Sequence, residues 1–138
     1  MLRRSKAQAL ADRISSPPVS NILVADDMSS TRLLVSRILQ EKGHRVIDVG
    51  AGDAVLKMLK MTTYNVIFLN LNMPPFRGGD YVESVRANGR EARIIVMTSD
   101  RREGTRNEVI RAGADRVIHP PLSPKQILGS LAPDWAAR

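Results

Sequence analysis

The sequence predicts an α/β fold in which five parallel strands form one sheet and helices cover both of its faces. Short, continuous apolar runs alternate along the chain with stretches in which apolar residues recur at helical spacing. The apolar runs lack the polar alternation of half-exposed strands, which is typical of strands buried on both faces of a parallel sheet. A length of 138 residues is that of a single domain with a substantial core.

The first strand and helix are expected directly after residue 20. The apolar run 22–25 ends in two aspartates, as a buried strand would end at the edge of a sheet. Ser29 or Ser30 is the expected N-cap of the following helix, and Gly43 ends it. The apolar positions expected to share one face of this helix are Leu34, Val35, Ile38 and Leu39.

The second and third strands are expected at residues 45–49 and 66–70. The helix between them begins near Asp53, and a proline-containing loop follows the third strand before the next helix, near Gly78 and Gly79. The apolar positions that support these two helices are Val55, Leu56 and Leu59 in the first and Tyr81, Val82 and Val85 in the second.

The last four elements repeat this alternation. A fourth strand is expected at 93–98, a helix at 103–112 that Gly113 stops, and a fifth strand at 116–119. The final helix is expected to begin at Ser123 or Pro124 and to bury Ile127, Leu128 and Leu131.

Three regions follow from this pattern: a basic N-terminal arm (1–20), one domain (21–132) and a short tail (133–138). The arm is either a flexible leader or a contact arm for a partner. No apolar run is long enough to span a membrane, and the N-terminus lacks the apolar segment of a secretory signal, so a cytoplasmic protein is expected. The absence of cysteine excludes disulfides and thiolate chemistry.

The chain is strongly basic, with a net charge of +7 and a pI near 10.5, and its cations are 16 arginines and 5 lysines. Arginine suits phosphates and carboxylates, so an anionic partner is one interpretation, and a solvated helix surface is the other. Nucleic acid is not favoured, because aromatic residues are few and no helix-turn-helix pattern is appended.

Polar residues follow the ends of four predicted strands. Because the carboxyl ends of parallel strands meet at one edge of the sheet, we expect these residues to lie close together. An aspartate pair beside a third oxygen ligand suits magnesium. The residues are Asp26, Asp27, Asn70, Thr98, Ser99 and His119.

Several segments together resemble one family, the CheY-like receiver domains of bacterial response regulators. The resemblance covers about residues 21–132 and implies a flavodoxin-like fold, with five parallel strands in the order 2-1-3-4-5, and a role in two-component signalling. The segments are Ile22-Leu23-Val24-Ala25-Asp26-Asp27, Asn72-Met73-Pro74 with Gly78, Met97-Thr98-Ser99, Arg111-Ala112-Gly113-Ala114-Asp115 and His119-Pro120.

The resemblance implies roles for four positions. Asp27 would be a direct magnesium ligand, Asp26 its water-mediated partner, and the backbone carbonyl of Asn72 a further ligand. Thr98 would be the hydroxyl that binds a phosphoryl group. Two plainer interpretations stay open: the aspartates form a weak cation site without a signalling role, and Thr98 is present for its strand propensity.

Four positions depart from the family pattern. Asn70 stands where receivers have the phosphoacceptor aspartate, His119 replaces a lysine, Arg116 an aromatic residue and Arg77 an acidic residue. An amide oxygen is a poor nucleophile, so aspartyl phosphate should not form at position 70, and magnesium should bind weakly. We interpret His119 as a residue tolerated after the lysine became unnecessary. The alternative explanation for Asn70 is an engineered Asp-to-Asn change at this position.

The sequence therefore predicts a pseudo-receiver that is not an enzyme, requires no cofactor and binds a signalling protein independently of phosphorylation. A histidine kinase, a phosphotransferase and a motility component are the expected kinds of partner. Two alternatives remain. The first is an arginine-based sensor of an anionic nucleotide such as cyclic di-GMP, and the second is an ordinary receiver with an engineered Asn70. The expected partner or anion surface consists of Arg101, Arg102, Arg106, Arg111 and Arg116.

Overall fold

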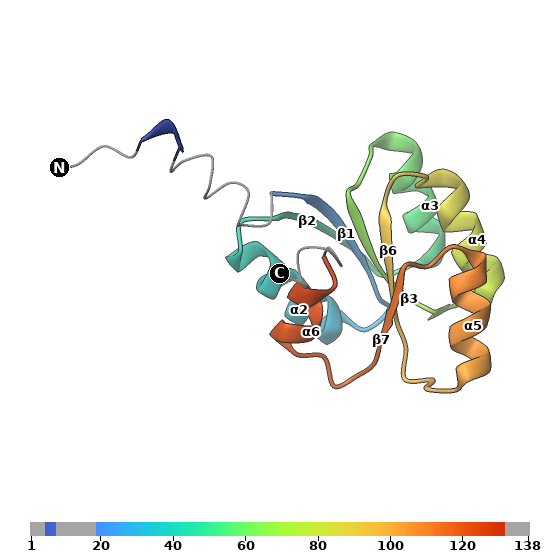
Figure 1. The fold of residues 1–138 in the computed structure, drawn as a ribbon. Helices are drawn as coiled ribbons and strands as arrows, with labels where there is room; N and C mark the ends of the chain where they lie inside the picture. The colour runs from blue at the N-terminus through green and yellow to red at the C-terminus, as the bar shows by residue number, and fades with distance from the viewer. Residues whose placement is uncertain (1–4, 8–18, 132–138) are drawn as a thin grey trace.

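The computed structural model describes residues 5–7 and 19–131 (Figure 1). The predicted tail and most of the predicted basic arm lie outside these residues. Within them, no helix has both the length and the apolar character needed to cross a lipid bilayer.

Five parallel strands form the central sheet, in the spatial order β2-β1-β3-β6-β7. This is the predicted order 2-1-3-4-5, so the fold class is confirmed. The inner strands are buried on both faces because helices cover both, which explains their continuous apolar sequences. The strands are β1 (Asn21–Ala25), β2 (Arg45–Val49), β3 (Val66–Asn70), β6 (Arg93–Met97) and β7 (Arg116–Ile118).

Helices form a layer on each side of the sheet (Figure 1). Residues alternate between the two faces along β1: Ile22 and Val24 join the core beneath α2 and α6, whereas Leu23 and Ala25 join the core beneath the other three helices. The helices are α2 (Ser29–Glu41), α3 (Gly52–Met61), α4 (Gly78–Asn88), α5 (Glu103–Ala112) and α6 (Pro124–Gly129).

Most predicted helix boundaries agree with the structure, and two details of α2 do not. The predicted serine N-cap is wrong: Met28 is the N-cap residue, and no side chain caps the helix. Leu34 is 45% exposed, because the buried face of α2 is centred on Val35 and Leu39. By contrast, α5 ends as predicted at Gly113, whose φ of 125° is a conformation that favours glycine.

The final helix is shorter than predicted and ends at Gly129, before Leu131. A second difference follows β3, where the predicted loop contains a small antiparallel hairpin of β4 (Asn72–Met73) and β5 (Phe76–Arg77). The Phe76 ring stacks on Tyr81, with ring centroids 5.3 Å apart, and the Tyr81 hydroxyl donates to the Gly52 carbonyl at 3.3 Å. These contacts hold the hairpin against the beginning of α3 and fix the chain that follows Asn70.

Candidate functional site

Asn70 and Asp27 lie next to each other because β1 and β3 are neighbouring strands that end at the same edge of the sheet. The Asn70 side-chain nitrogen donates to Asp27 Oδ1 at 3.2 Å, and the backbone N–H of Asn72 donates to Asn70 Oδ1 at 2.9 Å. The amide therefore presents its nitrogen to the carboxylate and its oxygen to the backbone. An aspartate could not donate the first of these bonds while ionised.

Asp26 lies behind Asp27 and is only 5% exposed. Its Oδ1 accepts the backbone N–H of Met28 at 2.9 Å, which holds the turn between β1 and α2. Burial raises the pKa of the Asp26 carboxyl above its usual value, and the Asp27 carboxylate adds to this rise, while the bonds from Met28 and Asn70 oppose it. Arg32 reaches the backbone carbonyl of Asp26, at 2.7 Å, rather than its carboxylate.

A cavity of about 360 Å³ opens over these residues. It contains six of the residues that the sequence singles out: Asp26, Asp27, Asn70, Asn72, Thr98 and Ser99. The remaining lining is mostly apolar and comes from Met28, Thr31, Leu34, Met97, Pro120 and Leu122. The lining therefore combines acidic and polar groups with apolar side chains.

His119, which the sequence predicts in the same pocket, does not line this cavity. Its ring Nδ1 lies 2.8 Å from the Thr98 carbonyl oxygen, and its own carbonyl accepts the side-chain N–H of Gln126 at 3.0 Å. The histidine is thus engaged with backbone at the end of β6. It does not supply the cation that a lysine at the end of the last strand could place beside the carboxylates.

The chemical type of the oxygen atoms around Asp27 suits a hard cation such as magnesium, because carboxylate, carbonyl and amide oxygens are the usual ligands of magnesium. Their charge is small, since only Asp26 and Asp27 are acidic. No group of three or more histidine, cysteine, aspartate or glutamate side chains in the described part of the chain is placed to hold a metal. The residues therefore fit weak magnesium binding and lack the third carboxylate of a strong site.

The loop after β6 is organised by Asp100. Its backbone N–H donates to the Thr98 hydroxyl at 3.1 Å. Its carboxylate accepts from the backbone and guanidinium of Arg102 and from the Thr105 hydroxyl, at 2.7–3.0 Å. The Arg102 bonds above all hold the pKa of Asp100 well below its usual value. An aspartate just before a predicted helix start is the sequence signal for such a turn.

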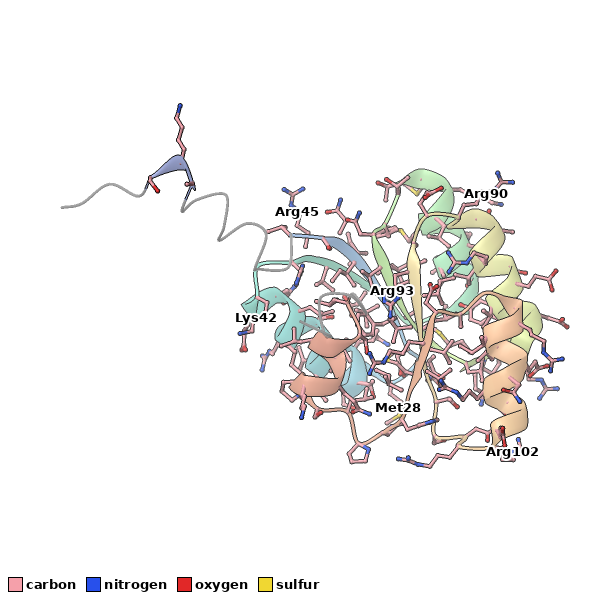
Figure 2. All side chains as sticks on the ribbon, in the orientation of Figure 1. Met28, Lys42, Arg45, Arg90, Arg93 and Arg102 are labelled. Atoms are coloured by element: carbon pink, nitrogen blue, oxygen red, sulfur yellow. The ribbon has the colours of Figure 1, made fainter. Side chains whose placement is uncertain are left out.

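A second cavity of about 610 Å³ adjoins the first and shares Asn72, Thr98 and Ser99 with it. Arg77 and Arg102 line it, and so do three carboxylates, Asp80, Asp100 and Glu108. Figure 2 shows Met28 and Arg102 at this end of the molecule and Arg90 at the opposite end. The mixture of charges does not single out an anion as a ligand.

The five arginines of the predicted surface do not converge. Arg101 donates to the Pro120 carbonyl at 2.9 Å, and Arg116 is partly buried and donates to the Gly129 carbonyl at 3.0 Å. Arg106 and Arg111 are exposed on α5. Arg102 alone of the five lines either of the two cavities described above. The structure thus places two exposed arginines on α5, beside the exposed Glu103 and Glu108, rather than a pocket of arginines.

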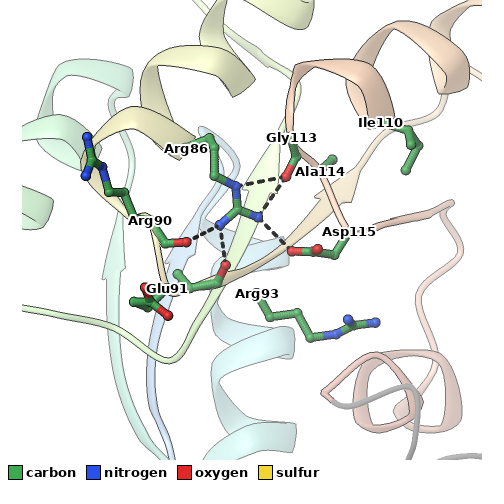
Figure 3. Close-up of a pocket in the computed structure, with 9 residues that line it drawn as sticks. Arg86, Arg90, Glu91, Arg93, Ile110, Gly113, Ala114 and Asp115 are labelled. Atoms are coloured by element: carbon green, nitrogen blue, oxygen red, sulfur yellow. Dashed lines mark hydrogen bonds and ion pairs between the residues drawn. The ribbon is translucent and has the colours of Figure 1, made fainter.

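A further cavity, of about 510 Å³, lies at the opposite end of the sheet beside Arg86 (Figure 3). The Arg86 guanidinium donates to the carbonyls of Gly89, Arg90, Ala92 and Gly113 and pairs with Asp115 at 2.8 Å. All of its nitrogens are engaged within the protein. Arg86 therefore joins α4 to the loops that precede β6 and β7, and it is not available to a ligand.

Comparison with known proteins agrees with this architecture. A family model for the response regulator receiver domain matches residues 22–132. The sensory/regulatory protein RpfC of Xanthomonas campestris is 29% identical over 115 residues, which cover 80% of this chain and 16% of that protein. The chain thus spans less than a fifth of the length of this relative.

Solved structures are also similar. The chemotaxis response regulator CheY4 of Vibrio cholerae superimposes with a TM-score of 0.76 at 27% identity, covering 83% of this chain and 97% of CheY4. The receiver domain of the sensor histidine kinase PA1611 from Pseudomonas aeruginosa, solved with a magnesium ion in its active site cleft, gives 0.74 at 23% identity and covers 88% and 100%. The fold, the strand-end residues and the family match agree, and the chain belongs to the response regulator receiver domain family.

Proposed function

We propose that this receiver domain is a pseudo-receiver, which binds a signalling protein without being phosphorylated and has no enzymatic activity of its own. The observation that carries the proposal is the amide of Asn70 at the end of β3, with its nitrogen directed at Asp27 Oδ1, 3.2 Å away. Phosphoryl transfer needs an oxygen nucleophile at this place, and the oxygen of a delocalised amide is a poor one.

The surroundings of Asn70 support the same conclusion. His119 bonds to the Thr98 carbonyl and is absent from the cavity lining, and the described residues that line this cavity include no lysine or arginine that could neutralise a phosphoryl oxygen. The PA1611 receiver holds magnesium in its cleft. In this chain we expect the corresponding cleft to bind magnesium weakly, because a neutral amide stands in place of a third carboxylate.

The partner we propose is a protein of two-component signalling in the cytoplasm, such as a histidine kinase, a phosphotransferase or a motility component. Of the predicted surface, the exposed Arg106 and Arg111 of α5 are the residues that we expect to meet acidic side chains of that partner. Cyclic di-GMP gains no support, because Arg101, Arg102 and Arg116 are bonded to other groups and do not surround one cavity.

Incubation with acetyl phosphate and magnesium, followed by intact mass measurement, tests the proposal. The unmodified chain is expected to gain no phosphoryl group. The double variant Asn70→Asp/His119→Lys is the positive control, because it restores both the nucleophile and the cation. A stoichiometric, acid-stable and base-labile adduct on the unmodified chain would refute the proposal. The origin of Asn70, natural or engineered, is decided by sequencing the gene in its source genome.

A further inference from the structure

The acidic cavity has an exposed hydrophobic wall that the core does not explain. Met28 and Leu34 line it and are 59% and 45% exposed, and Leu122 and Pro120 line it from the loop before α6. Burying exposed apolar side chains is favourable, so a wall of this kind beside a cavity indicates contact with another group. The carboxylates of Asp26 and Asp27 line the same cavity.

In the part of the chain that the structure describes, those carboxylates have no cationic partner. Among the ion pairs of the described residues, none includes Asp26 or Asp27, whereas Asp48, Asp53, Asp100 and Asp115 each pair with a lysine or arginine at 2.7–3.8 Å. The Asn70 amide offers Asp27 only a neutral hydrogen bond. Two neighbouring carboxylates without a counter-ion repel each other and favour a ligand that brings positive charge.

We propose that this cavity receives a lysine or arginine side chain from a protein partner. The methylene stem would lie along Met28, Leu34 and Leu122, and the charged head would reach Asp27 with Asp26 behind it. This assignment rests on the proposed phosphorylation-independent binding, and it names a second contact in addition to the exposed arginines of α5.

Two properties favour such a side chain over a free metal ion. Lysine and arginine combine an apolar stem with a charged head, which matches a cavity of about 360 Å³ whose lining combines apolar side chains with two carboxylates. Magnesium gains nothing from the hydrophobic wall and gives up its water reluctantly.

Titration of the full-length chain with n-pentylammonium, observed by ¹H–¹⁵N NMR, tests the cavity directly. Saturable shifts are expected for the amides of Met28, Asn70 and Leu122, and n-pentanol and pentanoate should produce none at the same concentrations. Asp27→Asn should weaken pentylammonium binding about tenfold, because one close charge is lost. Asp53→Asn makes the same change in net charge elsewhere and should leave binding within about twofold.

A second pair of variants tests the hydrophobic wall. Leu34→Gln should weaken pentylammonium binding, whereas Leu33→Gln should not, since Leu33 is 53% exposed on the same helix but does not line the cavity. Equal binding of pentanol and pentylammonium would overturn the inference. So would displacement of the amine by about 1 mM magnesium, which would show that a metal ion is the preferred occupant.

Selection of peptides from a random library against the full-length chain extends the test to protein ligands. Peptides whose binding is lost in Asp27→Asn are expected to carry lysine or arginine flanked by apolar residues. Peptides that ignore Asp27→Asn and depend on Arg106 would refute the cavity assignment and leave the proposed function standing. A phosphoryl adduct on the unmodified chain would instead refute the proposed function, and the amine titration would still decide the cavity.

Discussion

At the scale of single residues, position 70 decides the chemistry of the cleft. Asparagine and aspartate have nearly the same shape, so Asn70 completes β3 and bonds to the Asn72 N–H without disturbing the fold. The exchange removes one negative charge and replaces an acceptor oxygen with a donor nitrogen. The receiver fold can therefore remain intact while its phosphoacceptor is missing.

Restoring the carboxylate should restore cation binding. We expect Asn70→Asp to tighten magnesium binding by about 1–4 kcal/mol, the interaction of one added charge at close range near a protein surface. Isothermal titration with MgCl₂ measures the change, and Asp80→Asn, a charge change in the neighbouring cavity, serves as the control. Unchanged magnesium affinity in Asn70→Asp would show that the cleft is not a latent receiver site.

Burial of His44 is expected to make the stability of the fold depend on pH, and this dependence is unrelated to the cleft. It is 5% exposed, its Nδ1 accepts the Ser20 backbone N–H at 3.0 Å, and burial lowers its pKa from the usual 6.5. The fold therefore disfavours protonated His44, and stability should fall as the pH drops below about 6.5 towards the lowered pKa of the folded state.

The urea midpoint measured between pH 7.5 and about 5 checks this expectation. His44→Gln retains an acceptor for the Ser20 N–H and should remove the loss of stability. The raised pKa of Asp26 acts in the opposite direction, since protonation of a carboxyl with a raised pKa stabilises the fold as the pH falls. A profile identical in the wild type and His44→Gln would exclude His44 as the cause.

At the scale of elements, the helices begin in different ways. At α6, Ser123 accepts the Gln126 backbone N–H at 3.2 Å, and the Gln126 side chain accepts the Ser123 N–H at 3.2 Å, which is a capping box. No side chain caps α2. The short α6 thus depends on its cap more than the 13-residue α2 does.

Ser123→Ala should destabilise the protein by about 1 kcal/mol, because it removes the cap of α6. Ser29→Ala is the matched control: Ser29 is the first residue of α2 and makes no capping bond, so a change of no more than about 0.5 kcal/mol is expected. Urea denaturation of both variants measures the difference. Equal destabilisation by the two substitutions would show that the capping box contributes nothing to stability.

At the scale of the whole molecule, Arg86 joins parts of the fold that are distant in sequence. Its guanidinium contacts the loop before β6 and the loop before β7, and Asp115, its ion-pair partner, also accepts the Ile94 N–H at 2.8 Å (Figure 3). These bonds fix β6 and β7 relative to α4. The opposite end of β6 leads into Thr98 and Ser99, which line the cleft.

Arg86→Lys should destabilise the protein by about 2–4 kcal/mol, because an ammonium cannot reach the same set of carbonyls and leaves several of them unpaired. Arg90→Lys, an exposed position in the same region, should change stability by no more than about 0.5 kcal/mol. Thermal or urea unfolding compares the two variants. A loss below about 1 kcal/mol in Arg86→Lys would show that the guanidinium is not a structural brace.

Much of the fold could be predicted because strand and helix periodicity are local properties of the sequence. The predicted bounds of two strands (45–49 and 66–70) and of one helix (103–112) match the structure. Gly113 ends α5, as the sequence predicts. The hairpin at Asn72–Arg77 was missed because two-residue strands leave no periodic signal, and it depends on Phe76 packing against Tyr81. The exposure of Leu34 was missed because helical spacing alone does not say how wide the buried face is.

The sequence by itself determined that this chain is a receiver domain and that position 70 has no carboxylate, since both are properties of residue identity and order. Only the tertiary structure decided where side chains point. In the structure, the His119 ring contacts the Thr98 carbonyl and the Arg116 guanidinium donates to the Gly129 carbonyl. Asp26 and Asp27 line a cavity with Met28 and Leu34 and form no ion pair within the described residues. These arrangements depend on contacts between distant segments, and side-chain direction follows from packing rather than from sequence position.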